Sequence, residues 1–250
     1  MSKDENPVVV AVIPTHNHKR WIFPTLISLQ LQHYLPTALV VVDDGSSDGT
    51  LDALLAQMTE LQKKEWGWSG DYGGTNLVVA RNEEARGPAA ARNLGARLAS
   101  QFKPDLLAFC DSDDYYEQAK IYESVAAWKK APETIGVVYS DYYTVNSEGL
   151  SLRNYKEPYS TRLLQECIIN CDSLISWEAF QWAGGFPEDL RVCEDYALWL
   201  KICQKYLAYH IPEPLVNIRV GSHSSSATVP TEQWQSCYRK AFEWAGYKLA

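Results

Sequence analysis

Residues 106–118 read LLAFCDSDDYYEQ, an apolar run that is followed at once by three aspartates within four positions. The apolar run predicts a buried strand, and the acidic residues predict that this strand ends at a solvent-facing edge of its sheet. Carboxylates this close together repel one another unless water or a cation screens their charges. Two interpretations are open at this point: a solvated turn and a divalent-metal site.

Strand-like and helix-like segments alternate along the rest of the chain. Continuous β-branched or apolar runs predict strands buried on both faces, and the segments between them have helical periodicity. The alternation predicts a single α/β domain over residues 1–250, with a mainly parallel, Rossmann-like sheet and helices on both faces. The predicted strands are 8–13, 38–42, 76–80, 105–109 and 135–140, and the predicted helices lie near 22–29, 51–61, 87–101, 121–128 and 194–206.

Three further segments have weaker patterns. Residues 65–76 are rich in Gly and Trp and are predicted to be a loop, either a binding flap or a mobile surface loop. Residues 141–172 are predicted to be an irregular excursion over the sheet. Residues 207–226 are predicted to form a strand, a turn, a second strand and a polar loop.

Polar and acidic residues follow three of the predicted strands. The first strand ends in PTHN (14–17), the second in DDGSSD (43–48) and the fourth in CDSDD (110–114). Because parallel sheets bind ligands at the carboxyl ends of their strands, these three segments are expected to converge on one cleft.

Composition narrows the class of protein. The chain has 250 residues and a formal net charge of −8, which argues against a general nucleic-acid binder. No run approaches the roughly 20 apolar residues that span a bilayer, and the N-terminal sequence MSKDENP has no secretory apolar segment, so we expect a cytoplasmic protein. The six cysteines have no paired C-x-x-C spacing, which favours reduced, mostly buried thiols; zinc bound by Cys167 and Cys171 is the alternative.

The aspartates themselves favour the metal interpretation. At the end of an extended strand Asp111 and Asp113 point to one side and Ser112 to the other. Mg²⁺ and Mn²⁺ bind through one or two carboxylates, with phosphate oxygens and water completing the coordination shell. The pair therefore suits a metal-bound diphosphate.

Over residues 7–226 the chain resembles family-2 glycosyltransferases of GT-A fold. Five segments occur in the order typical of that family: VIPTHN (12–17), VVDDGSSDGT (41–50), GPAAARNLG (87–95), FCDSDD (109–114) and GGFPEDLRVCEDYALWLKI (184–202). The resemblance implies transfer of a sugar from a nucleotide diphosphate donor, typically UDP-linked, with inversion of the anomeric carbon and with Mn²⁺ or Mg²⁺ as cofactor. It further implies a nucleotide-binding half at about 7–115, an acceptor-binding half at about 116–226 and a C-terminal tail at 227–250.

The resemblance also implies donor-binding roles. Pro14 and Thr15 would border the nucleotide, as would Asn17, which stands where the family often has a Tyr-Asn pair. Asp44 would accept a hydrogen bond from the base, and Asp43 would support the ribose or its loop.

Further donor-binding roles fall on the matched helix and on the segment near residue 220. Gly87, Arg92 and Asn93 match the family's G…ARN helix, and Arg92 either reaches the donor or pairs with an aspartate. Arg219 and His223 resemble the loop that closes over the diphosphate, where a cation stabilises the leaving group; plain surface positions are the alternative for these two.

The remaining roles fall on acidic residues. Asp113 would hold the metal, Asp111 would contact the metal or the ribose, and Asp114 would support them. Asp195 is expected to be the base that removes the proton of the acceptor hydroxyl, with Glu194 as the second candidate, because the dipole at a helix N-terminus keeps a carboxylate ionised. A pair that merely favours the helix start is the alternative.

Departures from the family pattern refine the prediction. No Q-x-x-R-W sequence follows residues 184–202, which favours transfer of one sugar over processive synthesis. The acceptor would be a glycan or a lipid-linked molecule, with peripheral contact at the inner face of the membrane in the second case. His16 and His18 are interpreted as plain polar residues and not as a metal pair.

Three other classes of protein compete with this interpretation. SSDGTL (46–51) resembles the loop of haloacid-dehalogenase-type phosphatases, but Ser46 stands where the nucleophilic aspartate would be. A nucleotidyltransferase would need a Gly- and Lys-rich N-terminal loop, which is absent from the sequence. A non-catalytic nucleotide- or carbohydrate-binding module of the same fold stays open.

Overall fold

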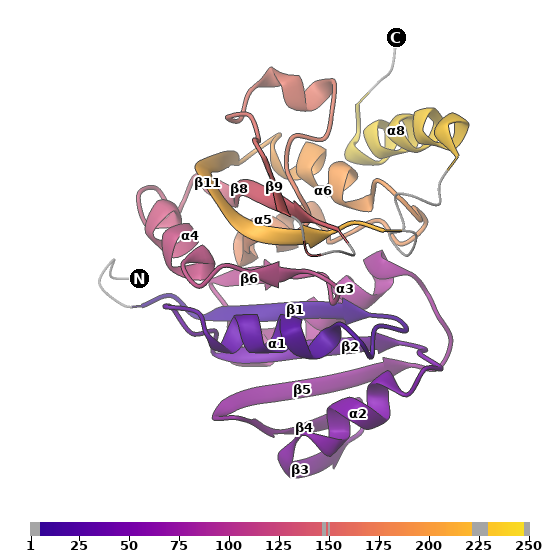
Figure 1. The fold of residues 1–250 in the computed structure, drawn as a ribbon. Helices are drawn as coiled ribbons and strands as arrows, with labels where there is room; N and C mark the ends of the chain where they lie inside the picture. The colour runs from indigo at the N-terminus through magenta and orange to yellow at the C-terminus, as the bar shows by residue number, and fades with distance from the viewer. Residues whose placement is uncertain (1–5, 147–148, 150, 222–229, 248–250) are drawn as a thin grey trace.

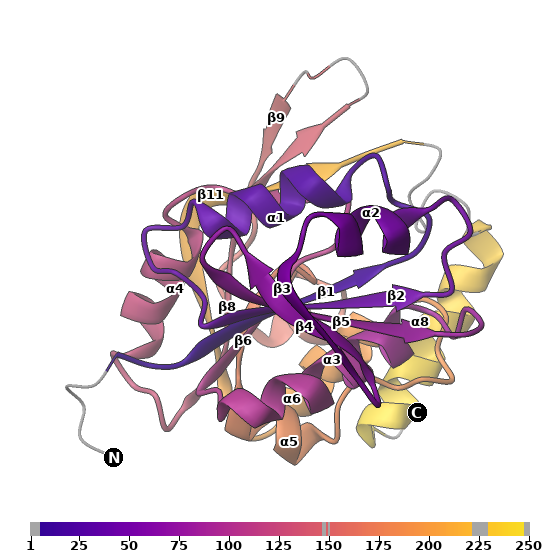
Figure 2. The ribbon, with the colours of Figure 1, turned by 90° about the horizontal axis from the view of Figure 1, so that it is seen from below.

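The computed structural model describes residues 6–146, 149, 151–221 and 230–247. Its central feature is one mixed sheet with the strand order β3-β4-β5-β2-β1-β6-β10-β8-β11-β7, to which β9 is added beside β8. Helices cover both faces of this sheet (Figure 1; Figure 2). The predicted α/β architecture is confirmed.

Four neighbouring strands of the sheet are parallel. The strands β1 and β2 pair in parallel, β2 pairs with β5, and β1 pairs with β6. Every residue of β1, β2 and β6 is buried, as continuous apolar runs between two helical layers require. Their bounds are Val9–Thr15 (β1), Ala38–Asp44 (β2), Thr75–Asn82 (β5) and Leu106–Phe109 (β6).

The other strands make the sheet mixed. β10 (Leu174–Ser176) runs antiparallel to both β6 and β8 (Ile135–Val145), and β8 pairs in parallel with β11 (Leu207–Arg219). β7 (Tyr115–Tyr116) is antiparallel to β11, and β9 (Ser151–Asn154) is antiparallel to β8.

The helices divide the core into two layers because alternate residues of each strand point to opposite faces. Val10 and Val12 of β1 pack with α3, α5, α6 and α8, whereas Val9 and Ala11 pack with α1, α2 and α4. Figure 2 shows α1 and α2 on one side of the sheet and α3, α5 and α6 on the other. The bounds are Ile22–Gln30 (α1), Thr50–Ala56 (α2), Pro88–Ala99 (α3), Lys120–Trp128 (α4), Trp177–Ala183 (α5), Glu194–Ile202 (α6) and Thr231–Ala245 (α8), with 3₁₀ turns at Ser100–Phe102 and Thr161–Leu164.

The predicted loop at 65–76 was wrong. This segment contains β4 (Gly67–Tyr72), which pairs in antiparallel fashion with β3 (Thr59–Lys64) and with β5. Gly73 and Gly74 connect β4 to β5, and both have positive φ, which a two-residue hairpin turn requires. The Gly-Gly pair was therefore a usable hairpin signal.

Two other predictions, for residues 51–61 and 207–226, were also wrong in part. The helix predicted near 51–61 ends at Ala56, so Met58 and Leu61 lie outside it, and Leu61 belongs to the exposed strand β3. Residues 207–219 form one long strand whose register shifts around Pro214, in place of two strands and a turn. Proline has no N–H to donate to a ladder, which explains the irregularity. None of the described helices has both the length and the hydropathy of a bilayer-spanning segment.

Candidate active site

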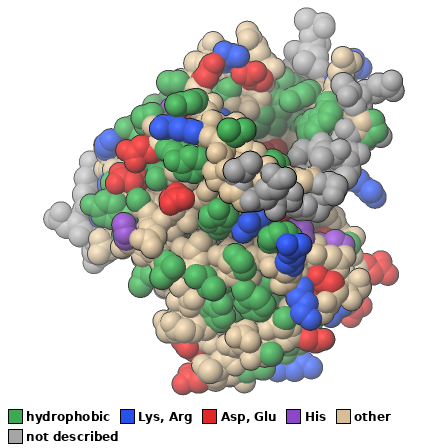
Figure 3. All heavy atoms as spheres, viewed as in Figure 1, with side chains coloured by type: hydrophobic (Ala, Val, Ile, Leu, Met, Phe, Trp, Pro, Cys, Tyr) green, Lys and Arg blue, Asp and Glu red, His purple; other side chains and the backbone are tan. Residues whose placement is uncertain are grey.

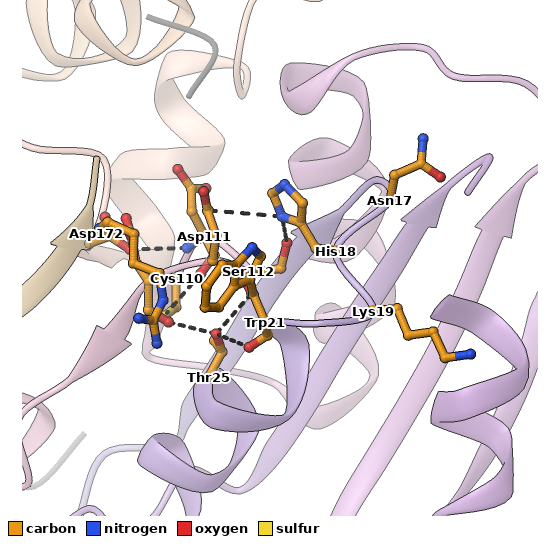
Figure 4. Close-up of polar contacts among 12 residues, drawn as sticks. Asn17, His18, Lys19, Trp21, Thr25, Cys110, Asp111, Ser112 and Asp172 are labelled. Atoms are coloured by element: carbon orange, nitrogen blue, oxygen red, sulfur yellow. Dashed lines mark hydrogen bonds and ion pairs between the residues drawn. The ribbon is translucent and has the colours of Figure 1, made fainter. Parts of the chain in front are cut away.

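The aspartates of residues 111–114 lie in the turn that follows β6. The side chains of Asp111 and Asp113 are 32% and 15% exposed, while Asp114 is buried. Thr25 of α1 fixes this turn, because its hydroxyl donates to the carbonyl oxygens of Ser112 (2.9 Å) and Asp114 (2.6 Å). The neighbouring α1 helix thus presents the acidic turn at the sheet edge (Figure 4).

Asp172 joins this turn, although the sequence interpretation did not include it. The N–H of Asp111 donates to Asp172 Oδ1 at 3.0 Å (Figure 4). Carboxylate oxygens of Asp111, Asp114 and Asp172 lie within 4.8 Å of one another. No local sequence pattern marked Asp172: β10 runs antiparallel to β6, so the residues before β10 reach the same edge as the residues after β6.

Charge repulsion in this cluster is reflected in its pKa values. Burial raises the pKa of Asp172 to about 7, and the charge of Asp111 adds to the effect. Burial also raises the pKa of Asp114 well above its usual range, with the charges of Asp172, Asp113 and Asp111 contributing. An all-oxygen set of clustered carboxylates is the donor chemistry that Mg²⁺ and Mn²⁺ prefer, so these residues fit such an ion.

Arg92 connects the acidic turn to the helix α6. It is almost fully buried on α3; its Nη2 donates to Asp111 Oδ1 at 2.6 Å and its Nη1 donates to Glu194 Oε1 at 2.7 Å. Of the two interpretations open for Arg92, pairing with an aspartate is the contact in this structure. Arg92 therefore holds the two acidic segments in one network.

The Glu194–Asp195 pair occupies the first turn of α6. Asp195 Oδ1 accepts a hydrogen bond from the N–H of Tyr196 at 2.7 Å. Burial raises the pKa of Glu194 to about 7 and also raises the pKa of Asp195, while the nearby charge of Arg92 opposes both shifts. The charge of Lys156 lowers the pKa of Asp195 as well. Glu194 is buried and Asp195 is partly exposed, so Asp195 is the more accessible of these two carboxyls with raised pKa values, and such a group is a candidate for a base.

The ends of β1 and β2 carry buried polar atoms. Thr15 Oγ1 and Asp43 Oδ2 have no hydrogen-bond partner among the described residues, and Arg81 Nε lies 3.8 Å from Asp43 Oδ2. Pro14 is buried beside Thr15. Asn17 has a positive φ of 56°, and its Oδ1 accepts from the N–H of Ser47 at 2.8 Å. These residues form one edge of the site.

The carboxylate of Asp44 accepts more hydrogen bonds than that of Asp43. Its carboxylate accepts hydrogen bonds from Asn82 Nδ2 (2.7 Å) and from the N–H groups of Arg86 (3.0 Å) and Gly87 (2.7 Å). Asp44 thereby holds the segment that leads into α3, where Gly87 has a φ of 96°. The predicted contact between Asp44 and a base stays a prediction; Asp43 is the carboxylate with an oxygen lacking a hydrogen-bond partner among the described residues.

Two further predicted donor residues have defined partners. Asn93 Nδ2 donates to the carbonyl of Phe186 at 2.9 Å, so Asn93 fixes residues 184–188. The guanidinium carbon of Arg219 lies 4.6 Å from the ring of Trp21 and 4.8 Å from the ring of Tyr115, and the backbone N–H of Arg219 donates to Asp114 Oδ1 at 2.7 Å. His223 lies outside the described residues.

His18 was interpreted from the sequence as a plain polar residue, but in the structure it contacts residues 112 and 113 of the acidic turn. Its Nδ1 lies 2.8 Å from Ser112 Oγ and 3.9 Å from Asp113 Oδ1. It links the segment after β1 to the acidic turn (Figure 4).

Known structures share this fold. The Staphylococcus aureus protein TarS in complex with UDP matches 97% of this chain and 67% of its own, with a TM-score of 0.70 and 19% identity. The complex of TarS with UDP-GlcNAc has a TM-score of 0.72 and 21% identity. The likeness confirms the GT-A type of α/β fold.

The chain belongs to glycosyl transferase family 2, because the model of that family matches residues 10–177. Among curated relatives, an uncharacterised glycosyltransferase of Rickettsia conorii is 24% identical over 90% of this chain and 35% of its own length. The Escherichia coli protein WfgD, named UDP-Glc:alpha-D-GlcNAc-diphosphoundecaprenol beta-1,3-glucosyltransferase, is 28% identical over 78% of this chain and 69% of its own. The chain spans about a third of the length of the first two curated relatives it matches.

Proposed function

We propose that this chain transfers one sugar from a UDP-linked donor to an acceptor hydroxyl and inverts the anomeric carbon. The observation that carries the proposal is the double contact of Arg92, which joins Asp111 after β6 to Glu194 beside Asp195. A transferase needs a donor site and a base next to each other, and the buried guanidinium of Arg92 would set that proximity here. The UDP complex of TarS and the name of WfgD support a uridine nucleotide as donor.

On the donor side, Asp113 and Asp111 would hold Mn²⁺ or Mg²⁺, with Asp114 and Asp172 behind them. Such an ion, held by these carboxylates, would supply positive charge for the diphosphate leaving group. The backbone of Arg219 is held to Asp114 and its guanidinium contacts the rings of Trp21 and Tyr115, so this side chain would add positive charge beside the leaving group. Pro14, Thr15, Asn17, Asp43, Asp44, Gly87 and Asn93 would form the nucleotide site or hold its loops.

On the acceptor side, Asp195 would act as the base. It would take the proton of the acceptor hydroxyl while the hydroxyl oxygen bonds to the anomeric carbon and the bond from that carbon to the diphosphate breaks. Attack from the side opposite the leaving group inverts the carbon. Glu194 would hold Arg92 and would be the second candidate for the base.

For the acceptor, we propose a glycan or a lipid-linked molecule, with peripheral contact at a cytoplasmic membrane face in the second case. The surface around α1 supports such contact, because Ile27, Leu31 and Leu35 are 48%, 55% and 60% exposed. Apolar side chains gather over α1 in Figure 3. Lys19 and Arg20, just before this helix, would favour an anionic surface.

The proposal is tested by the response of the thermal midpoint to UDP. We expect UDP to raise the midpoint in the presence of MnCl₂ and to lose most of this effect in EDTA, because a ligand that binds the folded state stabilises it by mass action. Asp113→Asn should weaken the metal-dependent response. Equal stabilisation by UDP with and without EDTA would argue against the proposed ion.

A second measurement separates an enzyme from a binding module. Asp195→Asn should keep the UDP response, because the base lies outside the diphosphate site, and should abolish hydrolysis or transfer of a UDP-sugar. Turnover by Asp195→Asn at the rate of the unchanged protein would exclude Asp195 as the base.

A further inference from the structure

The C-terminal helix α8 packs against the first turn of α6. Cys237 of α8 packs in the same hydrophobic cluster as Cys193, the residue that precedes α6. One residue further along α8, the ring of Tyr238 contacts the ring of Tyr196 edge-on, with centroids 5.3 Å apart. Cys193 and Tyr196 flank the acidic pair in the sequence, so α8 is fixed beside the proposed base from both directions.

Burial changes along α8. Ala241 and Ala245, in its second half, are fully buried, whereas Trp234 and Tyr238 are only half-buried. These two aromatic residues are four positions apart and therefore share a face of the helix. Their ring centroids are 6.3 Å apart with an interplanar angle of 38°. The half of α8 near the acidic pair thus carries adjoining ring surfaces that are partly open to solvent.

This pair of rings lies on the reactive side of the molecule. Tyr238 contacts the ring of Tyr196, the residue that follows Asp195, and Trp234 adjoins Tyr238 on the same helix. In Figure 1, α8 begins on the side toward which β1 points, where the acidic turn is also located. A molecule whose hydroxyl reaches Asp195 therefore comes close to these rings.

We propose that Trp234 and Tyr238 form an aromatic platform that binds a pyranose ring of the acceptor and directs its hydroxyl toward the first turn of α6, where Asp195 lies. The C–H face of a pyranose is apolar and stacks on an aromatic face, while its hydroxyl groups remain free to form hydrogen bonds at the ring edge. The inference rests on the proposed function, since it takes Asp195 to be the base. It adds that the acceptor group is a carbohydrate and that α8, which lies outside the family match, selects it.

Saturation-transfer NMR tests the platform with simple pyranosides in place of the natural acceptor. The probes are methyl β-D-pyranosides of glucose, galactose and N-acetylglucosamine, each added to the full chain with UDP and MnCl₂. We expect saturation to reach the ring C–H protons of at least one probe, and Trp234→Ala to weaken its binding about tenfold while Trp234→Phe retains part of it.

Trp182→Ala is the matched control. Trp182 is a 39% exposed tryptophan on α5 that contacts Tyr206 and Lys201, and its removal should leave the pyranoside signal unchanged. The platform is wrong if the unchanged protein transfers no saturation to any of the three probes, or if Trp234→Ala gives the same signal as the unchanged protein.

The metal-dependent UDP response, measured on the same samples, keeps the two proposals apart. Loss of the pyranoside signal in Trp234→Ala with the UDP response retained supports the platform and shows that the variant is folded. A retained pyranoside signal in Trp234→Ala, with a normal UDP response, overturns the platform and leaves the proposed function standing. Absence of a UDP response in the unchanged protein contradicts the proposed function itself.

Discussion

Arg92 is the residue on which the geometry of the site depends most. Its guanidinium is almost fully buried and is neutralised by Asp111 on one side and Glu194 on the other. Burial of a charge is costly unless it is paired and hydrogen-bonded, so each of the three groups needs the other two. The G…ARN sequence predicted Arg92 as a site residue, but its two carboxylate partners could not be deduced from sequence spacing.

Arg92→Met is therefore expected to destabilise the protein strongly. Removal of one partner from a buried charge pair leaves uncompensated carboxylates and costs about 3–5 kcal/mol in the free energy of unfolding. Urea unfolding followed by circular dichroism measures this change. The matched control is Arg86→Met, which removes an exposed pair with Glu188 at 2.9 Å and should cost less than about 1 kcal/mol. Equal losses in the two variants would contradict the bridging role of Arg92.

Lys120 is a second residue with a measurable consequence. It is fully buried in α4, and its Nζ donates to Ser140 Oγ at 3.0 Å. Burial lowers its pKa from 10.5 to about 7, so between pH 7 and pH 10.5 the unfolded chain binds a proton at this position that the folded protein does not. The contribution of Lys120 to stability therefore rises with pH across this range, by up to about 1.4 kcal/mol per pH unit.

Comparison with Lys120→Met isolates this effect. Between pH 7 and pH 9 the free energy of unfolding should increase more, or decrease less, in the unchanged protein than in Lys120→Met, as measured by urea titrations at each pH. Parallel pH dependences for the two proteins would show that Lys120 keeps its ordinary pKa when folded.

At the scale of elements, the approach of α3 to the sheet sets the position of Arg92. Gly95 lies on the buried face of α3, and a Cβ atom at that position would come within 2.4 Å of Val12 Cγ1 on β1. The glycine therefore allows a separation between helix and strand that any larger residue would increase. Because Arg92 lies almost one turn earlier on the same helix, that separation also fixes the height of its guanidinium above the strand ends.

Gly95→Ala should destabilise the protein by about 1–3 kcal/mol, although alanine is the better helix former, because overpacking forces the backbone or Val12 to move. Thermal or urea unfolding measures the loss. In the double variant Gly95→Ala/Val12→Ala, which removes the atom that clashes, part of this loss should be recovered relative to Val12→Ala alone. An increase in stability from Gly95→Ala would show that α3 is free to shift.

At the scale of the whole molecule, one sheet runs through the predicted donor and acceptor halves. β6 pairs with β1 on one side and β10 on the other, and both hydrophobic layers contain residues from the two halves. We expect a single unfolding transition in which tryptophan fluorescence and far-ultraviolet circular dichroism coincide. Two separated transitions would show that the halves are independent domains.

The sequence predicted those parts of the fold that follow from local patterns. The strands β1, β2, β5 and β6 were predicted from continuous apolar runs. Because β1 pairs in parallel with β2 and β6, the segments that follow these strands, 14–17, 43–48 and 110–114, lie at one edge of the sheet, as predicted. Contacts set by tertiary structure were not predictable in this way. Arg219 on β11 contacts the ring of Trp21, which lies nearly 200 positions earlier in the sequence. Asp172 enters the site because β10 runs antiparallel to β6.

The antiparallel direction of β10 limits which segments of this chain can be exchanged with those of a relative. Asp172 comes from the later half of the chain, yet its carboxylate accepts a hydrogen bond from the N–H of Asp111 in the earlier half. A hybrid that took residues 7–115 from this chain and the remainder from a relative would retain its acidic turn only if the relative supplied an equivalent carboxylate just before its own reversed strand. If the proposed donor site is correct, donor preference in such hybrids should follow the two segments grafted together, and hybrids that join unmatched segments should lose the proposed UDP response before they lose their fold.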